Sequence, residues 1–166
     1  MNKLHKGGVV ILDFGSQYTQ LIARRIREQN VYSEILPPET AFNEILTREP
    51  AALILSGGPS SVYEKDAPDF DTHILDSELP TLGICYGLHL LAQHQGGVVE
   101  STGQGEYGFA EITAENESGL LSDISSPSKV WMSHGDRVKH LPEGWQALAH
   151  SSNGVVAAMA NEDQSR

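Results

Sequence analysis

The chain has 166 residues, of which 39% are hydrophobic and 20% are charged. These are ordinary globular values, which argue against a disordered chain or a membrane protein, and the length suits one domain with a sizeable core. Acidic residues outnumber basic residues by 22 to 11, for a formal net charge of −11. Because this negative field would repel phosphate backbones and anionic lipids, we expect neither nucleic acid nor a membrane as a partner.

The first half of the chain alternates buried apolar runs with helical patterns. Apolar runs predict strands at residues 9–14, 31–36, 51–55 and 80–85, and helical spacing predicts helices at 16–28, 38–46 and 70–75. Continuous apolar strands separated by helices are typical of βαβ crossovers, which place strands in parallel and helices on both faces of the sheet. The pattern therefore predicts an α/β fold of three layers, with a mostly parallel central sheet flanked by helices.

The second half has a different character. Short strand-like runs occur at residues 98–100, 107–113, 129–133, 146–151 and 155–160, separated by turn-forming residues. They predict an antiparallel strand extension of the same sheet system, and no repeat or low-complexity linker separates the halves, so residues 1–166 are predicted to form a single domain. The polar turn after residue 160 leads to no further strand, which indicates either a frayed tail or a domain that lacks its last strand or strands.

Cysteine usage and the N-terminal sequence indicate the compartment. Cys85 is the only cysteine, so no internal disulfide can form, and the N-terminus leads into a strand without a long apolar signal region. No apolar run approaches the roughly 18 residues that a membrane-spanning helix requires. These features predict a cytoplasmic protein.

Cys85 lies in the sequence Gly83-Ile84-Cys85-Tyr86-Gly87, between a predicted strand and a predicted helix. This is the nucleophile-elbow pattern with cysteine in place of serine, and glycines at both ends remove clashes at the sharp bend. The helix N-terminus favours the reactive thiolate, and the Tyr86 N–H is aimed at an oxyanion formed by attack from sulfur. The alternative is a structural cysteine on a core strand.

A Gly57-Gly58-Pro59 turn follows another buried strand. If that strand lies beside the elbow strand, the turn can present a backbone N–H as a second oxyanion donor, although an ordinary tight turn explains it too. A phosphate-binding loop is excluded because no Gly-Lys-Ser/Thr follows.

A histidine base is the usual partner of a catalytic cysteine. Of seven histidines, His89 follows Cys85 by one helical turn, and His134 is next to Gly135 and Asp136 on a predicted loop after a strand. No histidine has a clear orienting partner in the sequence, so the base is left open.

Six segments resemble the class I, or triad-type, glutamine amidotransferase domains of the GMP synthase family. In chain order they are ILDFGSQYTQLIARRIRE, LILSGGPSSV, GICYGL, GGVVE, VWMSHGDRV and AAMANE, and together they cover nearly the whole chain. The resemblance implies a flavodoxin-like fold that a C-terminal helix would complete. It also implies glutamine hydrolysis through a cysteinyl thioester on Cys85.

In this family the released ammonia passes to an ATP pyrophosphatase (synthetase) domain or subunit, which aminates adenylylated XMP to GMP. The resemblance therefore implies L-glutamine as substrate and the synthetase as partner. It implies ATP and Mg²⁺ only in that synthetase part, with no cofactor and no metal in the glutaminase domain.

The resemblance also assigns site residues by position. Gly58 and Tyr86 correspond to the backbone oxyanion donors, and Ser133, Gly135 and Asp136 correspond to a loop lining the glutamine site. His89 stands where the family usually has a substrate-holding glutamine, and its imidazole has a different reach and fewer donors.

The family's catalytic histidine and glutamate lie in a His-Pro-Glu segment, which the 166 residues do not contain. This departure predicts little or no turnover by these residues alone, because nothing obvious protonates the leaving ammonia. It also leaves two alternatives: a non-catalytic flavodoxin-like binding or regulatory module, and another class I amidotransferase subunit.

Overall fold

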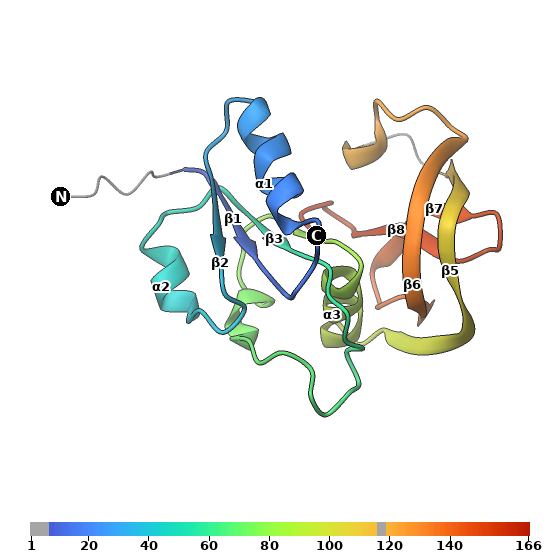
Figure 1. Cartoon of the computed structure of the whole chain (residues 1–166), viewed down its shortest axis with the longest axis horizontal. Helices are drawn as coiled ribbons and strands as arrows, with labels where there is room; N and C mark the ends of the chain where they lie inside the picture. The colour runs from blue at the N-terminus through green and yellow to red at the C-terminus, as the bar shows by residue number, and fades with distance from the viewer. Residues whose placement is uncertain (1–6, 116–118) are drawn as a thin grey trace. The chain divides into compact units, whose positions relative to one another are not determined.

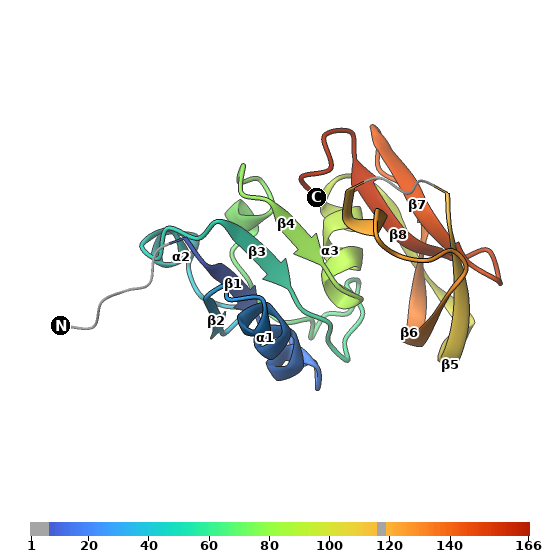
Figure 2. The same ribbon diagram turned by 90° about the horizontal axis from the view of Figure 1, so that it is seen from above.

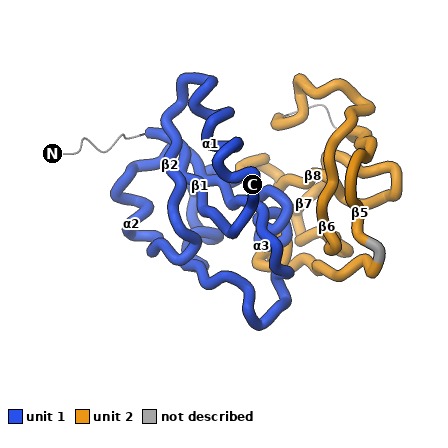
Figure 3. The backbone as a smooth tube through the Cα atoms, viewed as in Figure 1, with its two compact units in different colours: residues 1–91 blue, residues 92–166 orange. Residues whose placement is uncertain are grey.

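The computed structural model describes residues 7–115 and 119–166 and divides into two compact units, Met1–Leu91 and Ala92–Arg166 (Figure 3). Each unit contains a four-stranded sheet of its own. In the described ranges, no helix is both long and apolar enough to cross a membrane.

The first unit is built on a parallel sheet with strand order β2-β1-β3-β4; Figure 1 labels β1, β2 and β3, and Figure 2 labels all four strands. Its strands are β1 (Val9–Leu12), β2 (Ser33–Leu36), β3 (Ala52–Leu55) and β4 (Thr81–Gly83). All four predicted strands are present, although shorter than predicted. The parallel α/β architecture is therefore confirmed.

Helix α1 (Thr19–Glu28) covers one face of this sheet (Figure 2). Its Ala23 is fully buried in a cluster with Ile11 of β1 and Ile54 of β3. Its arginines lie on the exposed side, so the amphipathic pattern of the sequence orients the helix correctly. Helix α3 (Tyr86–His94) follows β4.

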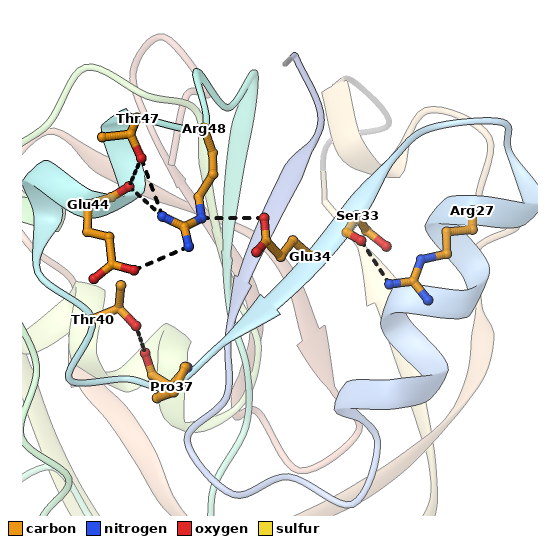
Figure 4. A network of polar contacts seen from close by, with 8 residues as sticks. All are labelled: Arg27, Ser33, Glu34, Pro37, Thr40, Glu44, Thr47 and Arg48. Carbon is orange, nitrogen blue, oxygen red and sulfur yellow. Dashed lines mark hydrogen bonds and ion pairs between the residues drawn. The ribbon is translucent and has the colours of Figure 1, made fainter. Parts of the chain in front are cut away.

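The segment between β1 and β3 is held by a network of polar contacts around Arg48 (Figure 4). Arg48 follows the short helix α2 (Phe42–Leu46), and its guanidinium donates to the Glu44 carbonyl at 2.7 Å and pairs with the Glu44 carboxylate at 3.2 Å. Its Nε lies 3.4 Å from Glu34 Oε2 on β2. Since β2 is an edge strand, this ion pair ties the edge of the sheet to the helix.

The predicted helix at residues 70–75 is only one 3-10 turn, η1 (Thr72–Ile74). Asp71 caps the start of this turn, and its carboxylate accepts the N–H groups of His73, at 3.1 Å, and of Phe42, at 2.8 Å. The second bond connects the turn to the start of α2 rather than to a continuing helix.

Asp71 is expected to make the first unit sensitive to acid. The Phe42 N–H, with smaller contributions from His73, holds the pKa of Asp71 below its ordinary value. A carboxyl with a depressed folded-state pKa contributes stability above its unfolded pKa of about 3.9, and this contribution is lost as the pH falls through the lower folded value. Asp71→Asn should therefore lower the urea midpoint at neutral pH and flatten its decline in acid; parallel profiles for the variant and the parent would contradict this.

The second unit is an antiparallel sheet with strand order β6-β5-β7-β8. Its strands are β5 (Val98–Ala114), β6 (Ser128–His140), β7 (Trp145–Ser151) and β8 (Val156–Asn161). The antiparallel character is confirmed. However, these strands form a separate sheet instead of extending the parallel one, and two predicted short strands are parts of one long strand, β5.

A small apolar core supports this second sheet. It joins Leu121, from the 3-10 turn η2 (Gly119–Leu121), to Leu148 and Ala149 of β7 and Ala160 of β8. The alternation of buried and exposed residues along β6 is typical of a sheet with one solvated face.

Candidate active site

Cys85 sits at a sharp bend between β4 and α3. Its φ of 52° places a non-glycine residue in the left-handed region, which costs about 1–3 kcal/mol. The Ile84 N–H donates to the Leu55 carbonyl at 2.9 Å, and the His89 N–H donates to the Cys85 carbonyl at 3.1 Å, so the bend is fixed on both sides. Cys85 is a free cysteine and is partly exposed.

The two glycines of the elbow have the steric role that the sequence predicts. A methyl group on Gly83 would lie 2.5 Å from the Gly87 carbonyl oxygen. One on Gly87 would lie 2.3 Å from the carbonyl oxygen of Leu55 in β3. Because both obstacles are backbone atoms, only glycine fits at either position.

The Tyr86 side chain is buried beside the elbow and packs against Phe14. It is 1% exposed, and its ring centroid lies 5.2 Å from that of Phe14. Burial, with a smaller effect of Glu64, raises the pKa of the phenol above its ordinary value, so the phenol stays neutral. The backbone N–H of Tyr86, the first residue of α3, has no acceptor within the helix.

The Gly57-Gly58 turn lies against the elbow because β3 and β4 are neighbours in the parallel sheet. A methyl group on Gly57 would lie 3.4 Å from Cys85 Cβ and 3.6 Å from Ser16 Oγ. One on Gly58 would lie 2.4 Å from the Phe14 carbonyl oxygen. The carboxyl ends of β1, β3 and β4 thus meet around Cys85, as the rule for parallel sheets requires.

Two polar residues that support this edge were not predicted as site residues. Ser56 is completely buried; its hydroxyl accepts the Phe14 N–H at 2.9 Å and donates to the Gly57 carbonyl at 2.9 Å. Asp13 Oδ1 accepts the Gly15 N–H at 3.0 Å and the Thr19 hydroxyl at 2.8 Å. The sequence could have pointed to Asp13, because it is the only charged residue in the apolar run 9–14. The role of Ser56 could not be predicted in this way, because it depends on how β1 and β3 pair.

The helix N-terminus supplies positive potential at Cys85. Helix α3 has nine residues and no acidic residue in its first turn. Its unpaired N–H groups and dipole therefore favour a thiolate at the bend.

His89 lies on α3 and is 8% exposed. Its backbone N–H bonds to Cys85, so the two residues are separated by one helical turn. The side chain of His89 is therefore largely buried.

The segment 133–136 is not the predicted loop, because Ser133, Gly135 and Asp136 all belong to strand β6 of the second unit. The opposite strand supplies the irregularity instead: the register of β5 shifts between Ser101 and Glu106. Ser133 is exposed, Gly135 is partly buried and Asp136 is 8% exposed.

His134 has an orienting partner that the sequence does not reveal. Its Nε2 lies 3.4 Å from Oε2 of Glu106, which faces it across the ladder from β5. Within residues 7–115 and 119–166, no group of three or more His, Cys, Asp or Glu side chains could hold a metal ion.

Comparisons with known proteins agree with this geometry. The glutamine amidotransferase class-I family matches residues 10–165. A protein of Bifidobacterium longum named GMP synthase [glutamine-hydrolyzing] is 48% identical over 158 residues, and the match covers 95% of this chain and 30% of that protein. One of Gloeothece citriformis with the same name is 47% identical over 162 residues, covering 98% of this chain and 30% of that protein.

Solved structures share the fold. A Thermoplasma acidophilum protein provisionally described as part of a GMP synthase superposes with a TM-score of 0.82 at 25% identity, covering 97% of this chain and 81% of that one. A glutamine amidotransferase of Thermotoga maritima gives 0.75 at 22% identity, covering 95% and 73%.

The chain spans about 30% of the length of the curated relatives that it matches. The family match, by contrast, runs through nearly all of its residues and includes the elbow at Cys85. The chain therefore belongs to the class I glutamine amidotransferase family.

Proposed function

We propose that this chain is the glutaminase component of a GMP synthase, releasing ammonia from L-glutamine through a thioester on Cys85. The observation that carries the proposal is the left-handed backbone of Cys85, held at a strand-to-helix bend against the Gly57-Gly58 turn. Backbone strain of this kind clusters at functional sites, where the surrounding structure holds a side chain in a fixed position.

The chemistry begins with attack by the Cys85 thiolate on the side-chain amide carbon of glutamine. A C–S bond forms, and the carbonyl oxygen becomes an oxyanion that the N–H groups of Gly58 and Tyr86 would stabilise. The C–N bond then breaks, and the nitrogen takes up a proton and leaves as ammonia. Water hydrolyses the γ-glutamyl thioester to glutamate and regenerates the thiol.

Four further residues are proposed to bind glutamine: His89, Ser133, Gly135 and Asp136. His89 replaces the glutamine side chain that the family usually has at this position. A neutral imidazole offers one donor, whereas an amide offers two, so the contact to substrate must differ in geometry.

The ammonia acceptor is proposed to be the ATP pyrophosphatase, or synthetase, part of the same enzyme, which would aminate XMP to GMP. Support comes from the relatives named GMP synthase [glutamine-hydrolyzing], which are about three times longer than the matched region. ATP and Mg²⁺ would act in that part, and the glutaminase step itself needs neither.

We further propose that residues 1–166 by themselves form the thioester but turn over slowly. The sequence lacks the His-Pro-Glu segment that carries the family's base, and without a base the protonation of ammonia and the activation of water are slow. The elbow and the N–H groups proposed as oxyanion donors, in contrast, belong to residues that the 166-residue sequence contains.

Labelling of Cys85 tests the proposal directly. Because the helix N-terminus favours the thiolate, iodoacetamide or a glutamine-like electrophile should modify Cys85 of the 166-residue polypeptide at neutral pH at least about tenfold faster than it modifies free cysteine. L-Glutamine, but not D-glutamine, should protect the thiol. Mass spectrometry of the single cysteine reads out both effects.

A labelling rate no faster than that of free cysteine, without protection by L-glutamine, would contradict the proposal. That result would favour a non-catalytic binding module instead. Ammonia release by the full-length protein without amination of XMP would favour another class I amidotransferase.

A further inference from the structure

Glu106 and His134 form a largely buried pair in the second unit. They face each other in register across β5 and β6, and their side chains are 11% and 15% exposed, respectively. Glu106 Oε2 lies 3.4 Å from His134 Nε2, is itself buried, and has no hydrogen-bond partner.

The hydrogen bonds around the pair determine where protons lie. His134 Nδ1 is 2.7 Å from the Asp136 carbonyl oxygen. Because a carbonyl only accepts, Nδ1 must carry a hydrogen. A neutral His134 would then turn the lone pair of Nε2 toward the carboxylate, and two acceptors would face each other in a buried position.

One proton between Nε2 and Oε2 removes this conflict. The other carboxylate oxygen, Oε1, already accepts the Ser151 hydroxyl at 2.9 Å and the Asn153 amide at 2.7 Å. Two donated hydrogen bonds favour the ionised carboxylate, which assigns the proton to Nε2. The pair is then an imidazolium beside a carboxylate, with no net charge.

The segment that this pair holds is the one assigned to glutamine binding. Regular pairing of β5 with β6 is interrupted between Ser101 and Glu106: His134 pairs with Glu106 and Asp136 with Ser101, but the register gives Gly135 between them no partner on β5, so the ladder alone does not fix Gly135. Side chains of β5 supply the missing contacts: Thr102 Oγ1 donates to the Gly135 carbonyl at 3.0 Å, and Glu106 holds the His134 ring, which in turn bonds to Asp136.

We propose that Glu106 is a positioning residue for glutamine binding, which holds a protonated His134 and thereby fixes the backbone of Gly135 and Asp136. This inference rests on the proposed function for the role of residues 133–136. The protonated pair itself rests only on the geometry of the second unit.

Nitrogen NMR of the His134 ring tests the pair independently of any activity. In the parent protein at pH 7, both ring nitrogens should show the shifts of protonated nitrogens. In Glu106→Gln the amide can donate to Nε2, so Nε2 should shift to the unprotonated range while the fold is retained. Glu111→Gln, a matched change at an exposed position of β5, should leave the His134 signals unchanged. An unprotonated Nε2 in the parent protein would overturn the assignment.

Glutamine kinetics of the full-length protein test the positioning role. Glu106→Ala removes all the contacts of the carboxylate and should raise the KM for glutamine about tenfold or more, with kcat within about twofold. Glu106→Gln keeps the donors to Oε1 satisfied and should restore most of the affinity. Glu111→Ala should behave like the parent. Should Glu106→Ala fail to fold, Asn153→Ala removes one bond at an exposed turn and should give a smaller KM increase.

The possible failures are distinguishable. Parental KM values in a folded Glu106→Ala protein, or in Asn153→Ala when that variant replaces it, would overturn the positioning role and leave the proposed function intact. Absence of glutamine hydrolysis by the parent protein would overturn the proposed function, and the positioning role with it, while the NMR result would still decide the protonated pair.

Discussion

Cys85→Ala is expected to abolish glutamine-dependent ammonia release by the full-length protein, with a fall in kcat of at least about 10⁴-fold. Loss of a nucleophile typically removes nearly all catalysis beyond that supplied by binding and the oxyanion donors. On the proposed function, amination with externally added ammonia should survive, because that step would not use the thiol. Ammonia and GMP are measured together, once with glutamine and once with added ammonia as the nitrogen source, which separates glutamine hydrolysis from the amination step.

The strained backbone gives this experiment an internal control. Alanine at residue 85 retains the penalty of the left-handed region, whereas glycine does not. Cys85→Gly should therefore be inactive but more stable than Cys85→Ala by about 1 kcal/mol in urea unfolding. Retained glutaminase activity in either variant would refute the role of Cys85, and equal stability of the two would refute the strain.

Features that depend on neighbouring residues in the sequence were predictable. The four parallel strands follow from continuous apolar runs, and the elbow follows from a pentapeptide with its own strand and helix on either side. Gly83 also follows, because a methyl group there would meet the Gly87 backbone, which the local bend brings close; the obstacle at Gly87 is Leu55 of β3, which only the sheet pairing brings there.

Features that depend on distant pairing were not predictable. The prediction of a loop at residues 133–136 was wrong. These residues belong to strand β6, and the extra residues of the irregular pairing lie in the facing strand, β5. The contact of Glu106 with His134 could be identified only from the register of β5 and β6. The helix predicted at 70–75 is a single 3-10 turn, and the bond from its capping residue Asp71 to the distant Phe42 N–H is recorded by no local pattern.

Gly87→Ala is expected to destabilise the first unit by about 2 kcal/mol or more. Helix propensity alone favours alanine at this position of α3 by about 1 kcal/mol. The added methyl group, however, would lie 2.3 Å from the carbonyl oxygen and 2.7 Å from Cβ of Leu55, a fully buried residue of β3. Neither atom can move without shifting the central sheet, so overpacking of about 3 kcal/mol or more outweighs the propensity gain.

Gly57→Ala is the matched control, because its methyl group would meet nothing closer than Cys85 Cβ at 3.4 Å. Its stability should stay within about 0.5 kcal/mol of the parent, whereas Gly87→Ala should lower the urea midpoint clearly. Equal midpoints for the two variants would show that α3 can move away from β3. The elbow would then not be held by close packing, and the left-handed conformation of Cys85 would lose its support from the sheet.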